Sequence, residues 1–376
     1  MPVIAVTRER RSGETRVAAT PETVQKLVAA GVSVIVEQGA GLTAAITDAD
    51  YRAAGAALAP EPAAAIADAD ILLKVRMPEP SEIGALKAGA IVVGLLDPHR
   101  EAEALGAIAA RGASALAMEL TPRITRAQAM DALSSQANLA GYRAVVEAAA
   151  AYGRALPMMM TAAGTVAPAK VFVMGAGVAG LQAIATARRL GAVVTATDVR
   201  PAAKEQVESL GGRFVAVQDE EFHQAETAAG YARPMSADYQ ARQAALVGDH
   251  IGKQDIVITT ALIPGRPAPR LVTAGQVASM ARGSVIVDLA VEQGGNVEGV
   301  RPGEVWTSEG GVTLVGLANL PGRVAADASA LYARNLLALT GLLLAEDGRL
   351  APDWEDEILK AALVVKDGVV VPQALS

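Results

Sequence analysis

The stretch VFVMGAGVAG at residues 171–180 sets the fold of this chain. Its apolar start suits a buried strand, and its glycines follow the spacing G-x-G-x-x-G before an alanine-rich helical stretch. Gly175 permits a tight turn, Gly177 lets the backbone approach a pyrophosphate, and Gly180 lets the helix pack closely on the strand. The N–H groups at the positive end of that helix attract phosphate oxygens. We therefore predict a dinucleotide site, at which Val178 and Ala179 also contact the cofactor.

A carboxylate follows the next predicted strand. Residues 193–197 form that strand, and it ends at Asp198, at the expected distance of about 20 residues beyond the glycine motif. Such a carboxylate accepts hydrogen bonds from the adenine ribose hydroxyls and repels a 2′-phosphate. The site is therefore expected to favour NAD(H) over NADP(H). Arg200 argues against this preference to a small degree, because an arginine can accommodate a 2′-phosphate.

Short apolar runs alternate with helical stretches along the whole chain, which predicts parallel α/β units. A chain of 376 residues is long enough for two domains. We expect two Rossmann-like, doubly wound parallel-sheet domains, the first of them discontinuous: residues 1–134 with 322–376, and residues 135–321. The predicted strands are 3–6, 34–37, 71–75, 91–95 and 113–117 in the first domain, and 171–174, 193–197, 214–217, 255–259, 284–288 and 312–315 in the second.

Composition excludes several classes of protein. The net charge of −7 argues against nucleic-acid binding, and the lack of cysteine excludes disulfides and thiolate chemistry. The three histidines, His99, His223 and His250, are scattered, so we expect no metal site. The most apolar run, residues 336–345, has about half of the roughly 20 residues that a membrane span needs. We expect a soluble protein with no direct membrane insertion.

The connection between the predicted strands 214–217 and 255–259 is unusually long. Such connections commonly have two to six residues, so a longer one is either functional or mobile. We expect a mobile loop at about residues 218–240, and it contains Gly230 and Tyr231.

Several stretches together closely resemble the NAD(H)-binding component of proton-translocating transhydrogenase, and the resemblance covers essentially the whole chain. They are MELTPRITRAQAMD (118–131), SSQANLAGYR (134–143), MMMTAAGT (158–165), ATDVR (196–200), ETAAGY (226–231), TTALIPG (259–265) and VDLAVEQGG (287–295).

The resemblance implies roles for individual residues. Arg123, Gln128 and Asp131 match the family's Arg-Gln-Asp loop beside the nicotinamide, and Ser134 matches a hydroxyl there. Arg123 and Asp131 can pair across the loop, while Gln128 is suited to bridging toward the second nucleotide. Tyr231 would lie on the lid and shield the rings from water. Further cofactor contacts are implied at Val199, Arg200, Gly230, Gln243, Ala261 and Leu262.

The implied reaction is a direct hydride transfer from NADH to NADP+ bound on a partner subunit, in the Re/Si-specific, proton-translocating class. It needs no general base, so the protein supplies proximity, orientation and exclusion of water. The sequence contains a single G-x-G-x-x-G, so the NADP(H) site and the membrane-spanning part are expected on other chains. The resemblance also implies a homodimer, and a cytoplasmic location at the inner face of the cell membrane through those partners.

Two alternatives stay open. The related alanine dehydrogenases hold their substrate with residues that match Arg16 and Lys74, but they also need a histidine where VVGLLDPH (92–99) offers none in the matching place. Asp288 and Glu292 lie where that family has a catalytic aspartate, and their roles here are unassigned. The second alternative is a non-enzymatic, NAD-responsive regulatory module.

Overall fold

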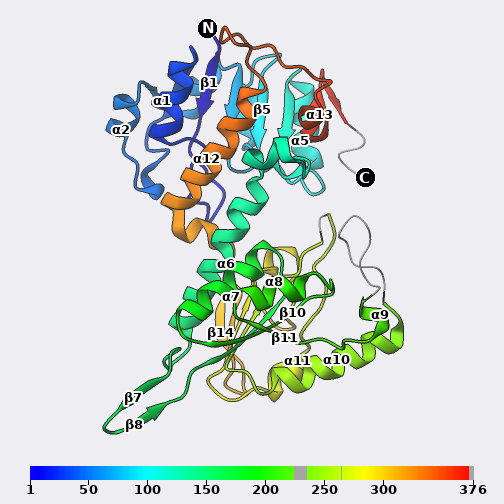
Figure 1. Ribbon diagram of the computed structural model, residues 1–376. Coiled ribbons are helices and arrows are strands. Elements are labelled where there is room, and N and C mark those ends of the chain that lie inside the picture. The colour runs from blue at the N-terminus through cyan, green and yellow to red at the C-terminus, as the bar shows by residue number, and fades with distance from the viewer. Residues whose placement is uncertain (224–234, 264, 372–376) are drawn as a thin grey trace. The chain divides into compact units, whose positions relative to one another are not determined.

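The computed structural model describes residues 1–223, 235–263 and 265–371 (Figure 1). The chain divides into two compact units, residues 1–136 with 321–376 and residues 137–320. Helix α6 (Ala132–Ala151) contains the first crossing between the units, and the short 3₁₀ helix Leu320–Val324 contains the second.

The first unit is built on an eight-stranded sheet in the order β17-β16-β6-β5-β4-β1-β2-β3. The six strands from β3 to β6 are parallel, and β16 and β17 extend the edge in antiparallel pairing. The strands are β1 (Val3–Val6), β2 (Ser33–Glu37), β3 (Ala57–Ala59), β4 (Ile71–Leu73), β5 (Ile91–Gly94), β6 (Ser114–Ala117), β16 (Leu363–Lys366) and β17 (Val369–Val370). The order 3-2-1-4-5-6 of the parallel part is that of a doubly wound dinucleotide-binding fold.

Helices cover both faces of this sheet. Ile4 and Val6 of β1 belong to one apolar cluster and Ala5 to another, because successive side chains of a strand point to opposite faces. The helices packed on the first face are α1 (Pro21–Ala29), α2 (Asp48–Ala53), α12 (Ala325–Gly341) and α13 (Glu357–Ala362). Those on the second face are α3 (Pro62–Ile66), α4 (Pro80–Ala85) and α5 (Ala102–Ala110). Figure 1 shows α1 and α12 side by side, and they are in contact.

The second unit repeats this plan with seven strands in the order β11-β10-β9-β12-β13-β15-β14. All pairs are parallel except β14 with β15 at one edge. The strands are β9 (Lys170–Met174), β10 (Val193–Thr197), β11 (Arg213–Phe214), β12 (Ile256–Thr259), β13 (Val285–Asp288), β14 (Val305–Thr307) and β15 (Thr313–Val315). One face packs on α6, α7 (Val178–Arg189) and α8 (Ala203–Ser209), and the other on α10 (Ala237–Ile251) and α11 (Ala274–Ser279).

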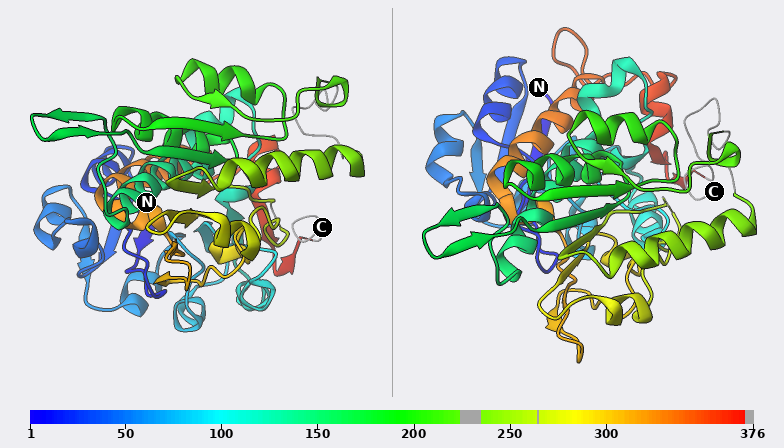
Figure 2. Two further views of the ribbon diagram at one scale, coloured as in Figure 1. Left: turned by 90° about the horizontal axis from the view of Figure 1, so that it is seen from below. Right: turned by 60° about the horizontal axis from the view of Figure 1, so that its bottom comes forward.

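A hairpin stands apart from the seven-stranded sheet. Strands β7 (Met159–Thr161) and β8 (Gly164–Val166) pair only with each other among the described residues, and all their residues are exposed. Both views in Figure 2 show the hairpin projecting from the rest of the second unit. No strand is predicted here from the sequence, because the run is short and its apolar residues do not alternate with polar ones.

The fold class predicted from the sequence is confirmed: both units are doubly wound parallel sheets. Most predicted strands differ from the observed ones by one or two residues at an end, whereas the predicted strand 214–217 is wrong in extent, since β11 ends at Phe214. Within the expected mobile loop, α9 (Glu220–His223) and the start of α10 are helical, and residues 224–234 lie outside the described part. Among described helices, none has the length and apolar character to cross a membrane.

Gly141 in α6 is required by the packing of the second unit. A β-carbon at this position would lie 2.0 Å from the carbonyl oxygen of Ala179 in the first turn of α7. We expect Gly141→Ala to lower the free energy of unfolding by about 1–3 kcal/mol, the usual cost of overpacking, measured by urea denaturation.

The matched control is Gly106→Ala in α5, where a β-carbon would meet no atom within 4 Å. Replacing a helical glycine by alanine without a clash stabilises a protein by about 0.5–1 kcal/mol. Equal losses in the two variants would contradict the contact between α6 and α7.

Candidate dinucleotide site

The glycine loop joins β9 to α7 at the C-terminal edge of the second sheet, where ligands bind in doubly wound folds. Gly175 has a φ of 105°, a conformation that favours glycine. A β-carbon at Gly175 would lie 2.5 Å from the Thr260 hydroxyl, and one at Gly180 would lie 1.7 Å from the Gly175 carbonyl oxygen. The Thr260 hydroxyl donates to that same carbonyl at 3.0 Å. These two glycines are therefore needed for the close packing of the loop itself.

Gly177 differs from the other two glycines of the motif. It precedes the first turn of α7 in an extended conformation, and a β-carbon here would meet no atom within 4 Å. No side chain in the described part of the chain caps α7, so its first N–H groups are not taken up by a side-chain cap. Backbone donors at a helix N-terminus beside an open glycine fit a pyrophosphate. The neighbouring Val178 is 43 % exposed, as a residue at the mouth of such a site should be.

Asp198 follows β10 and its carboxylate faces the glycine loop. One oxygen, Oδ2, accepts from the Ala176 N–H at 2.7 Å and from Nη2 of Arg200 at 3.1 Å. The other, Oδ1, accepts from the backbone N–H and from Nε of Arg200, both at 2.9 Å. Val199 between them is 61 % exposed. The structure thus brings Asp198 and Arg200 together with the glycine loop.

Ala261 and Leu262 follow β12, next to Thr260. The buried side chain of Asn296 accepts from the Ala261 N–H at 3.0 Å and donates to the Ala261 carbonyl at 2.8 Å. It also donates to the Pro269 carbonyl at 2.8 Å, so one amide holds two loops. Asn296 is not predicted from the sequence, because its partners lie 27 and 35 positions away and no local pattern marks it.

Asp288 supports Asn296 from the end of β13. Its carboxylate accepts from the N–H groups of Ala290 and Val297 at 2.8 and 3.0 Å, and thereby shapes the turn that carries Asn296. Burial raises the pKa of Asp288, against the lowering effect of these hydrogen bonds. The side chain is fully buried, so within the described residues it serves the turn and has no exposed face toward a ligand.

Gln243 on α10 joins the end of β10 to the segment that follows β11. Its amide donates to the Thr197 hydroxyl at 3.2 Å and accepts from the Val217 N–H at 2.8 Å. This places Gln243 beside the C-terminal end of β10, with both ends of its amide in use. The other expected residues of this segment, Gly230 and Tyr231, lie outside the described residues.

The residues expected beside the nicotinamide belong to the first unit. Gln128 and Arg123 are exposed, on and before the 3₁₀ helix Thr125–Met130. Asp131 precedes α6, and its carboxylate accepts from the Ser134 N–H at 2.8 Å and the Ser134 hydroxyl at 2.6 Å. The expected pairing of Arg123 with Asp131 is absent from the described residues, because the carboxylate caps the start of α6 instead.

The comparisons with known proteins agree with this geometry. Residues 5–140 match the family model for the N-terminal domain of alanine dehydrogenase/PNT, and residues 144–373 match the model for its C-terminal domain. The chain belongs to the alanine dehydrogenase/PNT family. It is 53 % identical over 379 aligned positions to the first part of the alpha subunit of NAD(P) transhydrogenase from Rhodospirillum rubrum, covering 99 % of this chain and 98 % of the relative.

Among alanine dehydrogenase/PNT proteins, the transhydrogenase relatives are the more similar. A crystal structure of transhydrogenase from Sinorhizobium meliloti superimposes with a TM-score of 0.90 at 56 % identity, over 98 % of this chain and all of the other. The alanine dehydrogenase of Halomonas elongata is 31 % identical over 99 % of this chain and 95 % of its own length. The resemblance to the transhydrogenase family stated from the sequence is thereby confirmed.

The two residues that match substrate-holding positions in alanine dehydrogenases are buried and paired within this chain. Arg16 contacts Glu14 at 2.6 Å and donates to Gln136 at 2.8 Å. Lys74 lies 3.2 Å from Glu82 and 3.4 Å from Glu9. His99 is exposed on the turn after β5. Among described residues, no group of three or more His, Cys, Asp or Glu could hold a metal ion.

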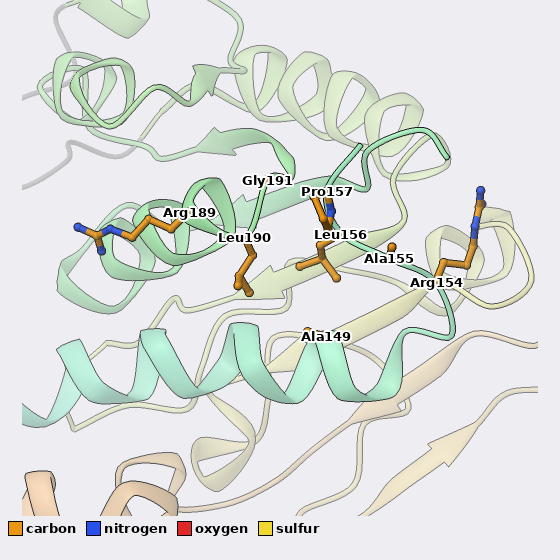
Figure 3. A pocket seen from close by; sticks show the side chains of 8 residues that line it. All are labelled: Ala149, Arg154, Ala155, Leu156, Pro157, Arg189, Leu190 and Gly191. Carbon is orange, nitrogen blue, oxygen red and sulfur yellow. The ribbon is translucent and has the colours of Figure 1, made fainter. Parts of the chain in front are cut away.

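The second unit also contains a pocket, which is shown in Figure 3. It has a volume of about 520 Å³ and contains none of the predicted site residues. Its lining comes from the C-terminal ends of α6 and α7 and the segment between α6 and β7: Ala149, Arg154, Ala155, Leu156, Pro157, Arg189, Leu190 and Gly191. Figure 3 shows the Arg154 and Arg189 side chains extending away from the other labelled residues, so the lining is mainly apolar.

Substitutions at Gly177 and Gly180 can distinguish an effect on NADH binding from an effect on folding. The β-carbon of a Gly177→Val variant would meet no atom within 4 Å, so we expect the free energy of unfolding to stay within about 0.5 kcal/mol of wild type. The same side chain blocks the approach of a pyrophosphate, so the Kd for NADH, measured by fluorescence titration, should rise about tenfold or more.

Gly180→Ala is the control with the opposite result. Its β-carbon would collide with the Gly175 carbonyl, so we expect a loss of about 1–3 kcal/mol in unfolding free energy. Wild-type NADH affinity in a folded Gly177→Val variant would exclude this loop as the phosphate site.

Glu14 makes the first unit sensitive to acid. Burial by itself raises the pKa of its carboxyl. Hydrogen bonds and charge from Arg16, together with the charge of Arg76, outweigh burial and lower the pKa from 4.5 to about 2. A lowered pKa in the folded state stabilises the fold above pH 4.5, and this contribution of roughly 3 kcal/mol is lost as the pH falls toward 2. Between pH 5 and pH 3 we expect wild type to lose about 2 kcal/mol more unfolding free energy than Glu14→Gln.

The measurement is urea denaturation at both pH values, with the exposed Glu346→Gln as control, which should follow wild type. Glu14→Gln should be less stable than wild type at pH 5, because it leaves the buried Arg16 without its anion. Parallel pH profiles for wild type and Glu14→Gln would contradict the role of this pair.

Proposed function

We propose that this protein is the NAD(H)-binding subunit of a Re/Si-specific, proton-translocating NAD(P) transhydrogenase. The observation that carries the proposal is the glycine loop with Asp198 at the neighbouring strand end, in a chain that is 53 % identical to a transhydrogenase subunit over almost its whole length. Open space beside Gly177 supports pyrophosphate binding, and the carboxylate of Asp198 supports the adenine ribose.

The remaining cofactor contacts follow from the neighbouring strand ends. Thr260 ties the end of β12 to the glycine loop, and Asn296 sets the backbone of Ala261 and Leu262 beside it. Because both the N–H and the carbonyl group of this backbone are hydrogen-bonded, the segment is rigid and can form one wall of the site for the nicotinamide half of the dinucleotide. When bound, NADH supplies the hydride, and its acceptor is NADP+ on the partner subunit.

We assign the positioning of the nicotinamide to Arg123, Gln128, Asp131 and Ser134. The hydrogen bonds between Asp131 and Ser134 hold both groups in one orientation. Arg123 has no side-chain hydrogen bond or ion pair within the described residues, which leaves its guanidinium available for a carboxamide or phosphate oxygen. Gln128 is exposed, as a side chain that reaches toward a nucleotide on another subunit must be. Tyr231 would exclude water from the rings, together with the segment that contains it.

The proposal includes partner chains that bind NADP(H) and span the membrane, and through them a position at the inner face of the cell membrane. The relatives are named as a portion of one subunit, alpha, which supports the need for further chains. We also propose a homodimer. Met158, Met159 and Met160 are 59 %, 43 % and 77 % exposed at the projecting hairpin, which supports burial of this surface against a second copy.

Hydride exchange tests the function. With the purified NADP(H)-binding partner present, we expect rapid exchange between NADH and an NADP+ analogue, and without it NADH binding but no exchange. The isolated chain should not oxidise NADH with pyruvate and ammonia. Turnover of those substrates would support the alanine dehydrogenase alternative, and nucleotide binding without turnover in either assay would support a regulatory module.

Two exposed arginines provide a matched pair of variants. Arg123→Ala should slow the exchange about tenfold or more, because a positioned donor to the nicotinamide side is lost. Arg126, three positions further on, pairs with Asp356 and Glu357 on the surface, so Arg126→Ala should keep the wild-type rate. Equal rates for the two variants would remove Arg123 from the site.

A further inference from the structure

The carboxylate of Asp198 has no unused acceptor position. A carboxylate offers about four lone-pair directions, and here two N–H groups of the backbone and two of the Arg200 guanidinium occupy them. The Arg200 guanidinium also donates to the Ala176 carbonyl at 3.3 Å. Arg200 therefore lies across the place where the adenine ribose would be bound, between the glycine loop and the end of β10.

This arrangement changes the electrostatic account of cofactor choice. A lone carboxylate would repel a 2′-phosphate directly, but Asp198 and Arg200 form a pair whose charges cancel. An arginine fork is itself the preferred binder of a phosphate group, by paired hydrogen bonds. The subsite thus contains a phosphate-binding group, and the carboxylate beside it keeps that group occupied.

The two partners differ in how easily they can separate. The side chain of Asp198 is 8 % exposed and is held by the Ala176 N–H, whereas that of Arg200 is 34 % exposed. The ribose hydroxyls can take over acceptor positions of the carboxylate when the guanidinium moves aside. A 2′-phosphate offers the carboxylate no such replacement, because it brings negative charge in place of hydroxyl donors.

We propose that Arg200 is a latent 2′-phosphate-binding residue, and that Asp198 excludes NADP(H) by holding Arg200 in the pair. The inference rests on the proposed function, since it assumes that this loop binds a dinucleotide. It differs from simple repulsion in one respect. If repulsion alone set the preference, Arg200 would not matter once the charge of Asp198 is removed.

The experiment compares the Kd values of NADH and NADPH, which differ only in the 2′-phosphate, for the full chain by fluorescence titration. Asp198→Asn removes the charge but keeps an oxygen for the Ala176 N–H. We expect this variant to bind NADPH about tenfold more tightly, as for one charge-assisted hydrogen bond gained with the 2′-phosphate. We expect it to bind NADH about tenfold more weakly, as for one such bond lost with the ribose hydroxyls. Adding Arg200→Ala to this variant should abolish the gain for NADPH.

The matched control adds Arg189→Ala to Asp198→Asn. Arg189 is exposed at the C-terminal end of α7, opposite the glycine loop, so the same charge change there should leave the gain for NADPH intact. Asp198→Ser, which also keeps an acceptor oxygen, replaces Asp198→Asn if thermal unfolding shows that the latter is misfolded.

A folded variant that gains no affinity for NADPH, or a gain in affinity that survives Arg200→Ala, would overturn the inference alone. Absence of NADH binding by wild type would overturn the proposed function and this inference together.

Discussion

The close contact between the glycine loop and the strand ends is the constraint that shapes the candidate site. The Gly175 carbonyl oxygen lies where a side chain at residue 180 would begin, and the Thr260 hydroxyl donates to that same oxygen. The first turn of α7 is therefore pressed against the C-terminal ends of β9 and β12. Its N-cap residue is Gly177, which has no side chain to cap the first N–H groups. These groups remain available to an anion, which is why a helix start at this edge of a sheet binds phosphates.

Polar side chains hold the backbone around this contact. Asn296 pairs with both backbone groups of Ala261, and Asp198 accepts from Ala176 in the loop itself. In the first unit, Asp131 accepts from the Ser134 N–H and so holds the backbone at the start of α6. Buried backbone groups must be satisfied, and each of these side chains does so at one geometry only. The segments around the candidate site are thereby held in place by the protein itself, and such ordering lowers the entropic cost of binding a ligand.

The buried charges of the first unit are paired within the chain. Arg16 and Lys74 match residues that hold a substrate in alanine dehydrogenases, yet here each one lies against carboxylates of the same chain. Burial of a charge is tolerated only when it is paired, and these pairs meet that condition without a ligand. The residue types alone would suggest a keto-acid site, whereas the pairing explains their presence as part of a structural network. The same reasoning applies to Asp288, whose carboxylate supports the turn that carries Asn296.

Local patterns in the amino-acid sequence were enough to predict the doubly wound fold class and most strand positions in both units. They also predicted the place of Asp198 after β10. These predictions were possible because apolar runs and the G-x-G-x-x-G spacing are local and periodic signals. The same patterns did not predict the edge strands β14, β16 and β17, or β3 and the hairpin, which are short and lack a periodic pattern. The pairing of Asp131 with Ser134 in place of Arg123 is a local helix cap that was not predicted. Two contacts were settled by the packed molecule alone: Gly141 meets Ala179, and Asn296 holds Ala261. These outcomes depend on which groups the packed sheets and helices bring within hydrogen-bond or van der Waals distance, and most of those groups lie far apart in the chain.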